Sequence, residues 1–124
     1  MQKNRPVNLD LKTIKMPLPA IVSILHRASG VVIFVCIPLL LWMLDASLES
    51  AASFESLKDL MDGFFATLIL WGVVGALLYH LVAGIRHLTM DLGIGETLEG
   101  GIKGAKIALA VSGLLILVVG IWLW

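Results

Sequence analysis

Three long stretches of apolar residues, separated by shorter polar segments, dominate the chain. They run roughly from Ala28 to Leu44, from Phe64 to Ile85 and from Ile107 to Trp124. A helix needs about 20 apolar residues to cross about 30 Å of hydrocarbon, so each stretch is close to the required length. Each span must satisfy its own backbone hydrogen bonds in lipid, and a closed barrel would need many more strands. The pattern therefore predicts an all-α membrane protein with three transmembrane helices.

The polar residues that flank these stretches set the expected boundaries. We expect one membrane domain over residues 1–124, with a polar N-terminal segment over residues 1–19 and helices at about 20–44, 64–90 and 105–124. The piece from Phe54 to Asp62 fits a short surface helix. Pro38 removes a hydrogen bond within the first span, which membrane helices tolerate when neighbouring groups satisfy the freed carbonyl.

The basic residues are distributed very unequally between the polar segments. Eight of the nine Lys and Arg residues flank one side of the predicted spans, and only Lys58 lies on the other side, among five acidic residues. Because loops rich in Lys and Arg stay in the cytoplasm, we expect a cytoplasmic N-terminus and a periplasmic C-terminus. Trp42, Trp122 and Trp124 then lie near the outer interface, as an aromatic belt would.

Composition narrows the class of protein further. The chain is 59 % hydrophobic, against about 45–50 % for soluble domains. Nine basic residues balance nine acidic ones, so no basic surface indicates nucleic acid. Cys36 is the only cysteine, which excludes an intrachain disulfide. The first twenty residues lack the apolar core of a signal peptide, so we expect Met1 to begin the mature chain, which favours a bacterial source.

One histidine, His80, lies inside the second apolar stretch. Ionisable residues within a span are costly and are candidates for function. Helical spacing puts Gly72, Ala76, Gly84 and His87 on the same face as His80. Small residues on such a face allow close approach of another helix. A flat porphyrin would need the same kind of surface with an imidazole in its middle, so both interpretations stay open.

The other histidines limit how a haem could be held. His26 and His87 lie at the cytoplasmic edge, and no second histidine lies deep within a span. A haem with two histidine ligands would therefore need its second ligand from another chain, whereas a single chain would leave the iron five-coordinate.

Further polar residues reach the cytoplasmic side of the predicted spans. Ser23 and Arg27 are four residues apart and share a helix face. Arg27 could pair with haem propionates or a polar quinone head, or it could simply extend to the membrane surface. Arg86, His87 and Asp91 arrive at the same side from the second span, so we expect one polar rim there.

Three segments of this chain match a known family. Arg5 to Leu11, Ser23 to Gly30 (SILHRASG) and Tyr79 to His87 (YHLVAGIRH), followed by Asp91, resemble the cytochrome b subunit of succinate dehydrogenase, the larger membrane anchor of complex II. The likeness covers almost the whole chain and is closest to the proteobacterial form. It implies that the three helices form part of a haem-binding bundle with a second membrane anchor subunit.

The resemblance also assigns residues to a cofactor and a substrate. It implies that His80 is an axial ligand of the iron of haem b, and that the partner anchor gives the other ligand. It places Ser23 and Arg27 at the ubiquinone, and Arg27 with His87 near the haem propionates. Asp91 is a weaker candidate for the rim of the quinone pocket. No residue of this chain is expected to oxidise succinate.

The expected setting is the bacterial inner membrane. By resemblance, a flavoprotein subunit with FAD and an iron–sulfur subunit pass electrons from succinate to ubiquinone, in the tricarboxylic acid cycle and aerobic respiration. One alternative is an anchor of a fumarate reductase, which runs the reverse reaction. Another is a non-redox accessory protein, in which the small-residue face packs helices and no haem is present.

Overall fold

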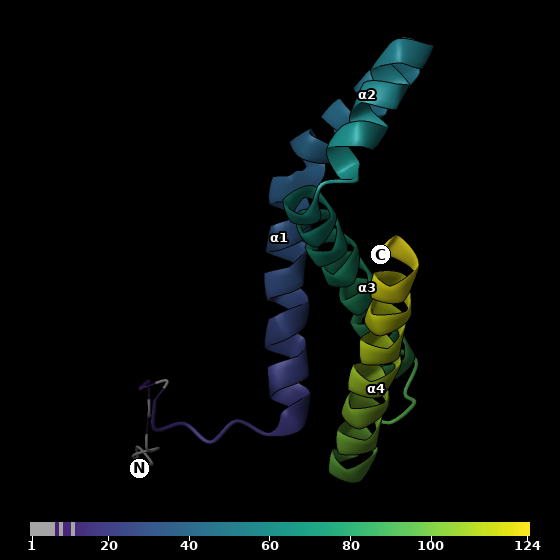
Figure 1. Cartoon of the computed structure of the whole chain (residues 1–124). Coiled ribbons are helices and arrows are strands. Elements are labelled where there is room, and N and C mark those ends of the chain that lie inside the picture. The colour runs from purple at the N-terminus through teal and green to yellow at the C-terminus, as the bar shows by residue number, and fades with distance from the viewer. Residues whose placement is uncertain (1–6, 8, 11) are drawn as a thin grey trace, which may run out of the picture.

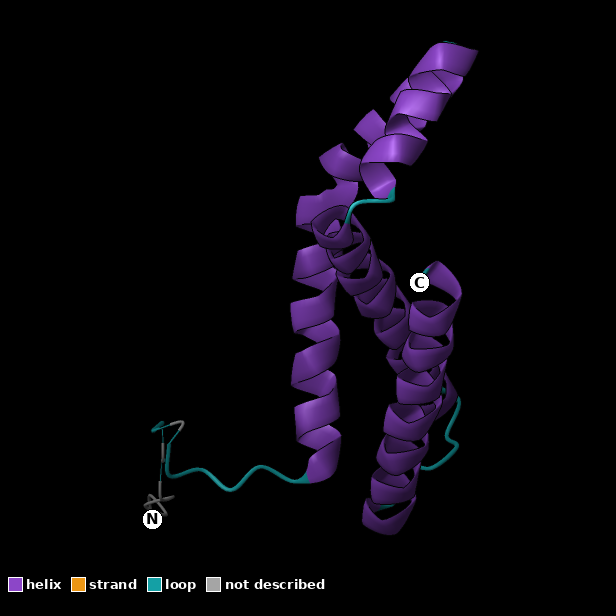
Figure 2. Cartoon of the chain, in the orientation of Figure 1, coloured by secondary structure: helices purple, strands orange, loops and turns teal. Residues whose placement is uncertain are grey.

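The computed structural model describes residues 7, 9, 10 and 12–124, which contain four helices and no strand. The helices are α1 (Leu18–Glu49), α2 (Ala51–Met61), α3 (Phe64–Asp91) and α4 (Leu98–Leu123) (Figures 1 and 2). Residues 5, 6, 8 and 11 of the first matching segment lie outside the described part. Three of the helices are long and apolar enough to cross a membrane, so the all-α architecture with three spans is confirmed.

Local capping explains where the long helices begin. Pro17 is extended and a second proline follows in the first turn, where its missing N–H costs nothing, so α1 begins at Leu18. It then continues through Pro38 to Glu49. The helix α4 begins at Leu98 rather than near residue 105, because the Thr97 hydroxyl accepts a hydrogen bond from the Gly100 N–H (3.0 Å) ahead of the apolar run.

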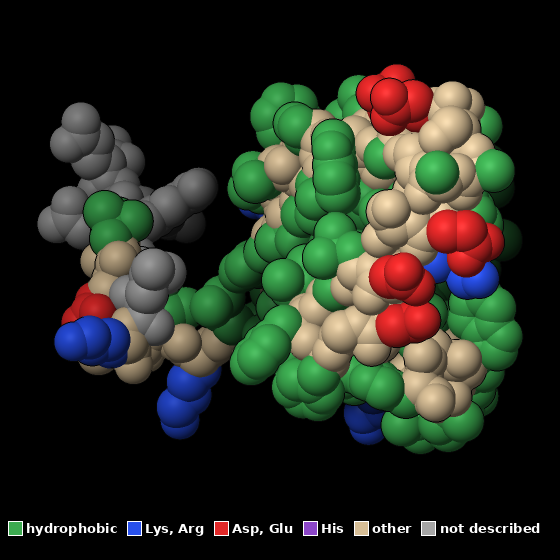
Figure 3. Space-filling model, turned by 45° about the horizontal axis from the view of Figure 1, so that its top comes forward, with side chains coloured by type: hydrophobic (Ala, Val, Ile, Leu, Met, Phe, Trp, Pro, Cys, Tyr) green, Lys and Arg blue, Asp and Glu red, His purple; other side chains and the backbone are tan. Residues whose placement is uncertain are grey.

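The two ends of the helix bundle differ in charge. The basic end contains the start of α1, the end of α3 and the start of α4, with Arg27, Lys103 and Lys106 exposed there. The acidic end contains the end of α1, all of α2 and the start of α3. Figure 3 shows acidic side chains gathered over this end. The single positive residue there, Lys58, lies 3.4 Å from Glu55 in a solvent-exposed pair.

Small side chains fill the contacts between the long helices. Val22 of α1, Ala83 of α3 and Ala105 of α4 are fully buried against one another. Beside them the Tyr79 hydroxyl donates a hydrogen bond to the Val22 carbonyl across 2.8 Å. Large apolar side chains instead point outward, and Trp122 is 81 % exposed. This arrangement is typical of membrane helices, which approach through small residues and cover their outer surface with apolar ones.

At the acidic half, α3 and α4 are joined by a tryptophan. The Trp71 indole N–H donates to the Ile116 carbonyl (2.8 Å), and the ring lies against Gly120, where a Cβ atom would come within 2.9 Å. Trp124 packs edge-on against Trp71 with ring centroids 5.5 Å apart. Glycine at position 120 therefore makes room for the indole.

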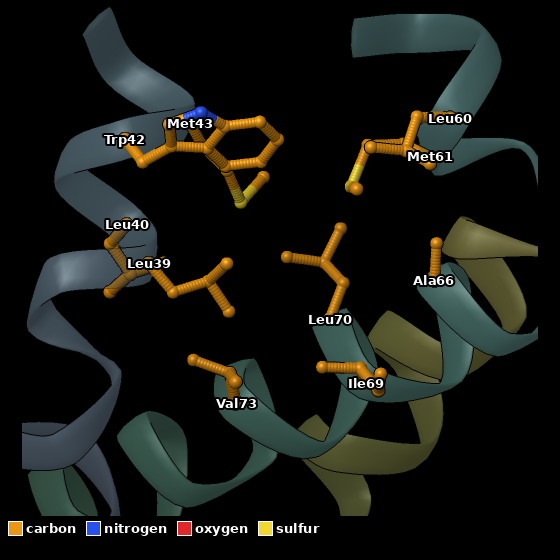
Figure 4. Close-up of a pocket in the computed structure, with 10 residues that line it drawn as sticks. All are labelled: Leu39, Leu40, Trp42, Met43, Leu60, Met61, Ala66, Ile69, Leu70 and Val73. Atoms are coloured by element: carbon orange, nitrogen blue, oxygen red, sulfur yellow. The ribbon is translucent and has the colours of Figure 1, made fainter. Parts of the chain in front are cut away.

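An apolar pocket of about 170 Å³ lies where α1, α2 and α3 meet at the acidic end (Figure 4). Its lining consists of Leu39, Leu40, Trp42, Met43, Leu60, Met61, Ala66, Ile69, Leu70 and Val73. None of these side chains carries a charge, and the thioethers of Met43 and Met61 lie among apolar neighbours, where methionine usually serves as packing. The pocket therefore contributes apolar surface and no acid–base chemistry.

Candidate functional site

The candidate site lies at the basic end, where α1 approaches α3 closely at His80. Gly30 of α1 faces the imidazole, and a Cβ atom at position 30 would come within 3.0 Å of His80 Cε1. The side chain of His80 is half-buried as a result. A glycine at this point lets the backbone of α1 lie directly against the ring.

Two groups of α1 contact the Nδ1 atom of His80. The His26 carbonyl oxygen lies 3.0 Å from Nδ1, and the Ser29 hydroxyl oxygen lies 3.1 Å from it. The Ser29 hydroxyl donates its own proton to the His26 carbonyl (2.7 Å), so it can only accept from the imidazole. Both neighbours of Nδ1 are acceptors, and this network assigns the proton of a neutral ring to Nδ1.

The Nε2 atom of His80 consequently carries the lone pair. It makes no hydrogen bond with any described residue. Histidines that bind metals usually donate the other ring N–H to a carbonyl, a carboxylate or water, which fixes the tautomer and the ring orientation. The network around His80 has the same form, which makes Nε2 a candidate nitrogen ligand.

Two more imidazoles extend the cluster. The His26 ring stacks on the His80 ring with centroids 4.1 Å apart and planes 12° apart, and the His87 ring lies 5.3 Å from that of His26. A broad open depression of about 400 Å³ is lined by His26, His80, Leu81, Gly84, His87 and Leu88. At Gly84 a Cβ atom would come within 3.4 Å of His26 Nε2, so the lack of a side chain there leaves room for the His26 ring in the depression.

The described residues do not form a self-contained metal centre. No group of three or more His, Cys, Asp or Glu side chains within residues 12–124 is placed to hold a metal ion. A metal at His80 would therefore need most of its ligands from outside this chain, as in a porphyrin whose axial positions are filled by protein nitrogen.

The other predicted site residues lie at the same end without joining this cluster. Ser23 is half-buried, whereas Arg27 and Asp91 are exposed. None of the three side chains forms a hydrogen bond or an ion pair with another described residue. Of the predicted set, the structure brings His80 and His87 to one depression, and it leaves the polar groups of Ser23, Arg27 and Asp91 open to external partners.

Sequence reasoning missed two contributions to this site. Ser29 was present only as a letter of a matching segment, and His26 was treated as an edge residue. Their spacing carries a signal, because a serine three residues after a histidine on a helix can bond to its carbonyl and lie on the same face. What the spacing does not show is that α3 places His80 against this pair.

Arg86 differs from its expected position on the polar rim with His87. Its guanidinium is buried between α3 and α4, and Nη2 donates to the Gly101 carbonyl across 3.2 Å. The side chain turns away from the depression because neighbouring positions on a helix point about 100° apart. The rim on the His80 side is therefore less basic than predicted.

A family model described as the succinate dehydrogenase/fumarate reductase transmembrane subunit matches residues 1–121. The chain belongs to this family. A succinate dehydrogenase cytochrome b556 subunit from Coxiella burnetii is 43 % identical over the full length of both chains. A subunit of the same name from Paracoccus denitrificans is 36 % identical, covering 88 % of this chain and 84 % of the relative.

Relatives of this transmembrane subunit family extend to mitochondria. A mitochondrial succinate dehydrogenase cytochrome b560 subunit from Sus scrofa is 36 % identical over 77 % of this chain and 57 % of its own length. Family membership confirms the resemblance seen in the sequence and the multi-pass membrane character. It leaves no support for a non-redox accessory protein.

Proposed function

We propose that the chain is a membrane anchor of succinate:ubiquinone oxidoreductase that binds haem b together with a second anchor subunit and forms part of the ubiquinone site. The observation that carries this proposal is the contact of His80 Nδ1 with the Ser29 hydroxyl and the His26 carbonyl. From these two acceptors we assign the proton of the neutral ring to Nδ1, which leaves the lone pair on Nε2. The relatives named cytochrome b support haem as the group that uses this nitrogen.

The residues around His80 fit a haem. Nitrogen from histidine is a usual axial ligand of haem iron, and Gly84 beside His80 leaves a low surface on α3. When bound, the haem would carry single electrons. Within this chain, Ser29 and His26 hold the ligand ring at its Nδ1 edge, and His87 lies where a propionate could accept a hydrogen bond. The second histidine would come from the partner anchor.

For the quinone, we assign Ser23 and Arg27 of α1. A quinone that takes two electrons also takes two protons, and negative charge develops on its carbonyl oxygens during reduction. A hydroxyl and a guanidinium that have no partner within the described chain can donate hydrogen bonds to those oxygens, which stabilises that charge. Asp91 is a weaker candidate at the rim of the same pocket.

The charge distribution supports an orientation for this assembly. With the basic end in the cytoplasm of a bacterium, the N-terminus is cytoplasmic and the C-terminus periplasmic in the inner membrane. The iron–sulfur and FAD-containing subunits would then bind over the basic end, next to Ser23, Arg27 and His80. Succinate oxidation would belong to those subunits, and this chain would act as one membrane anchor domain.

The proposed function is tested by the visible spectrum of the tagged chain, isolated from its native membrane in mild detergent. We expect flavin and iron–sulfur subunits to copurify and a reduced b-type haem signal to appear when succinate is added. If dithionite reduces the haem but succinate does not, the chain is a cytochrome, but succinate is not its electron donor. Isolation without haem or flavoprotein would overturn the proposal.

The quinone assignment is tested by Arg27→Leu. We expect succinate-dependent ubiquinone reduction to fall by at least about tenfold, because removing one preorganised donor from a developing oxyanion typically costs about 100- to 1000-fold. Subunit content should stay unchanged, since the exposed Arg27 side chain makes no hydrogen bond or ion pair with a described residue, and the haem spectrum should change less than quinone reduction does. Lys12→Leu is the control for removal of a positive charge, and full quinone activity in assembled Arg27→Leu would refute the assignment.

A fumarate reductase anchor remains the second candidate, because the matching family model covers both enzymes. The two differ in the quinone that they use and in the favoured direction of electron flow. Assays of the isolated complex with ubiquinone and with menaquinone analogues separate them. A clear preference for menaquinol oxidation coupled to fumarate would favour this alternative.

A further inference from the structure

Arg86 carries a buried positive charge that the described chain leaves unbalanced. The residue is only 8 % exposed, and the one hydrogen bond of its side chain within the described residues joins Nη2 to the Gly101 carbonyl. Its Nε atom is buried and has no hydrogen-bond partner in the part of the chain that the structure describes. Within the described residues the only ion pair is between Lys58 and Glu55, at the opposite end of the bundle. Arg86 therefore has no counter-ion among them.

A charge in this position requires a partner. Burying an ionised group without compensation is costly, and a guanidinium cannot escape the cost by losing its proton. The acidic residues nearest in sequence are Asp91, Glu96 and Glu99, and all three are exposed. An anion from outside the chain is consequently the partner that best explains why an arginine is placed here.

A depression of about 230 Å³ opens beside the Arg86 side chain, between α3 and α4 at the basic end. Lys103 lies on its lining as a second cation, and Met90 and Ile107 provide apolar surface. A Cβ atom added at Gly104 would lie 3.5 Å from Arg86 Nε. Because Gly104 has no side chain, it does not cover the Arg86 guanidinium on this side of the depression. Two positive charges thus meet apolar side chains in one depression.

We infer that this depression binds the phosphate group of an anionic phospholipid, with Arg86 and Lys103 at the phosphate and with Met90 and Ile107 against the upper part of the lipid. A phosphate offers several acceptor oxygens for a guanidinium and an ammonium. Because Lys103 lies in the second turn of α4, the pair of cations is close to the level of the lipid head groups. A free phosphate ion would satisfy the charges but would leave the apolar lining uncovered.

The test uses the tagged chain with all subunits that accompany it, washed in neutral detergent to remove endogenous phospholipid. Its melting midpoint is measured during titration with short-chain phosphatidylglycerol, short-chain phosphatidylcholine or sodium phosphate at constant ionic strength. We expect only phosphatidylglycerol to raise the midpoint in a saturable manner. This measurement does not involve haem, quinone or succinate, so its outcome is independent of the proposed function.

Variants of two exposed lysines make the test specific. Replacing Arg86 removes the bond to Gly101 that joins α3 to α4, so its loss could prevent folding for another reason. Lys103→Gln avoids this problem and should require about fivefold more phosphatidylglycerol for the same shift, an effect typical of one lysine at an anionic lipid surface. Lys106→Gln, one turn further along α4 and outside this depression, should behave like the wild type.

Four results would overturn the inference. An equal shift with phosphatidylcholine would remove the need for an anion at the lipid. An equal shift with sodium phosphate would assign the charges to a free ion. Equal weakening by Lys103→Gln and Lys106→Gln would indicate general surface attraction. No shift with any of the three probes would leave a carboxylate of an accompanying subunit as the counter-ion of Arg86.

Discussion

The basic and acidic ends of the bundle use glycine for different purposes. At the basic end, Gly30 of α1 lies against the imidazole of His80, and the ring keeps one nitrogen bonded and the other open. At the acidic end, Gly120 of α4 lies against Trp71, whose only polar atom is bonded to the Ile116 carbonyl. The first contact presents a reactive atom, whereas the second one closes a packing interface.

The difference shows that a close glycine contact does not by itself mark a functional site in a membrane protein. At both glycines, an added Cβ atom would come within about 3 Å of an aromatic ring. What separates them is the state of the ring's polar atoms, since an indole has one N–H and an imidazole has a second nitrogen to offer. The following variants test this comparison, from the largest expected effect on the haem signal to the smallest.

Of the three variants that test the glycine comparison, Gly30→Val should have the largest effect on the haem signal. Even a Cβ atom would meet His80 Cε1 at 3.0 Å, so the valine must displace the ring or the helix, and such overpacking typically costs about 1–3 kcal/mol. We expect haem per complex to fall at least about fivefold in the reduced-minus-oxidised spectrum, with the anchor still present in the membrane. Gly113→Val is the control, because a Cβ atom there meets nothing within 4 Å. Full haem content in Gly30→Val would contradict the close fit.

Ser29→Ala should weaken haem binding less. The variant loses one acceptor at His80 Nδ1 but keeps the His26 carbonyl at 3.0 Å. Loss of a group that orients a metal ligand typically reduces affinity by about 10- to 100-fold, and the remaining carbonyl places this case near tenfold. Before dilution we therefore expect a smaller loss of haem per complex than in Gly30→Val. Haem retention during dilution in detergent measures the change. Ser47→Ala is the control, since that hydroxyl only bonds within its own helix. Equal retention in both variants would remove Ser29 from the site.

Gly120→Val should leave the haem spectrum unchanged while lowering stability. A Cβ atom at this position would lie 2.9 Å from the Trp71 ring, so the valine must push α3 and α4 apart. Such overpacking typically lowers the free energy of unfolding by about 1–3 kcal/mol. We expect a lower melting midpoint and a normal b-type signal below it. A selective loss of haem in this variant would show that the two ends are coupled, against the comparison made above.

Most of the fold could be predicted from the sequence, because the length of an uninterrupted apolar stretch is enough to identify a membrane-spanning helix. The start of α4 was predicted too late, since its first turns contain Gly100, Gly101 and Lys103 and owe their helical form to the Thr97 cap. Apolar length carries no information about such a polar first turn.

The site was less accessible. Helical spacing placed His80 on a face of small residues and put His87 on the same side, and the structure agrees with both positions. Spacing within one helix does not show which neighbour each face meets. For that reason the contacts of His80 with Ser29 and Gly30, and the turn of Arg86 toward α4, could be seen only after the helices were packed.

The central claim is that His80 offers Nε2 to the iron of a haem. Its most direct test is the visible spectrum of purified His80→Ala, recorded before and after addition of imidazole. We predict loss or marked change of the b-type signal and partial restoration by imidazole, which can occupy the space that the side chain leaves. A wild-type spectrum from His80→Ala, unchanged by imidazole, would contradict the claim and remove His80 as the ligand.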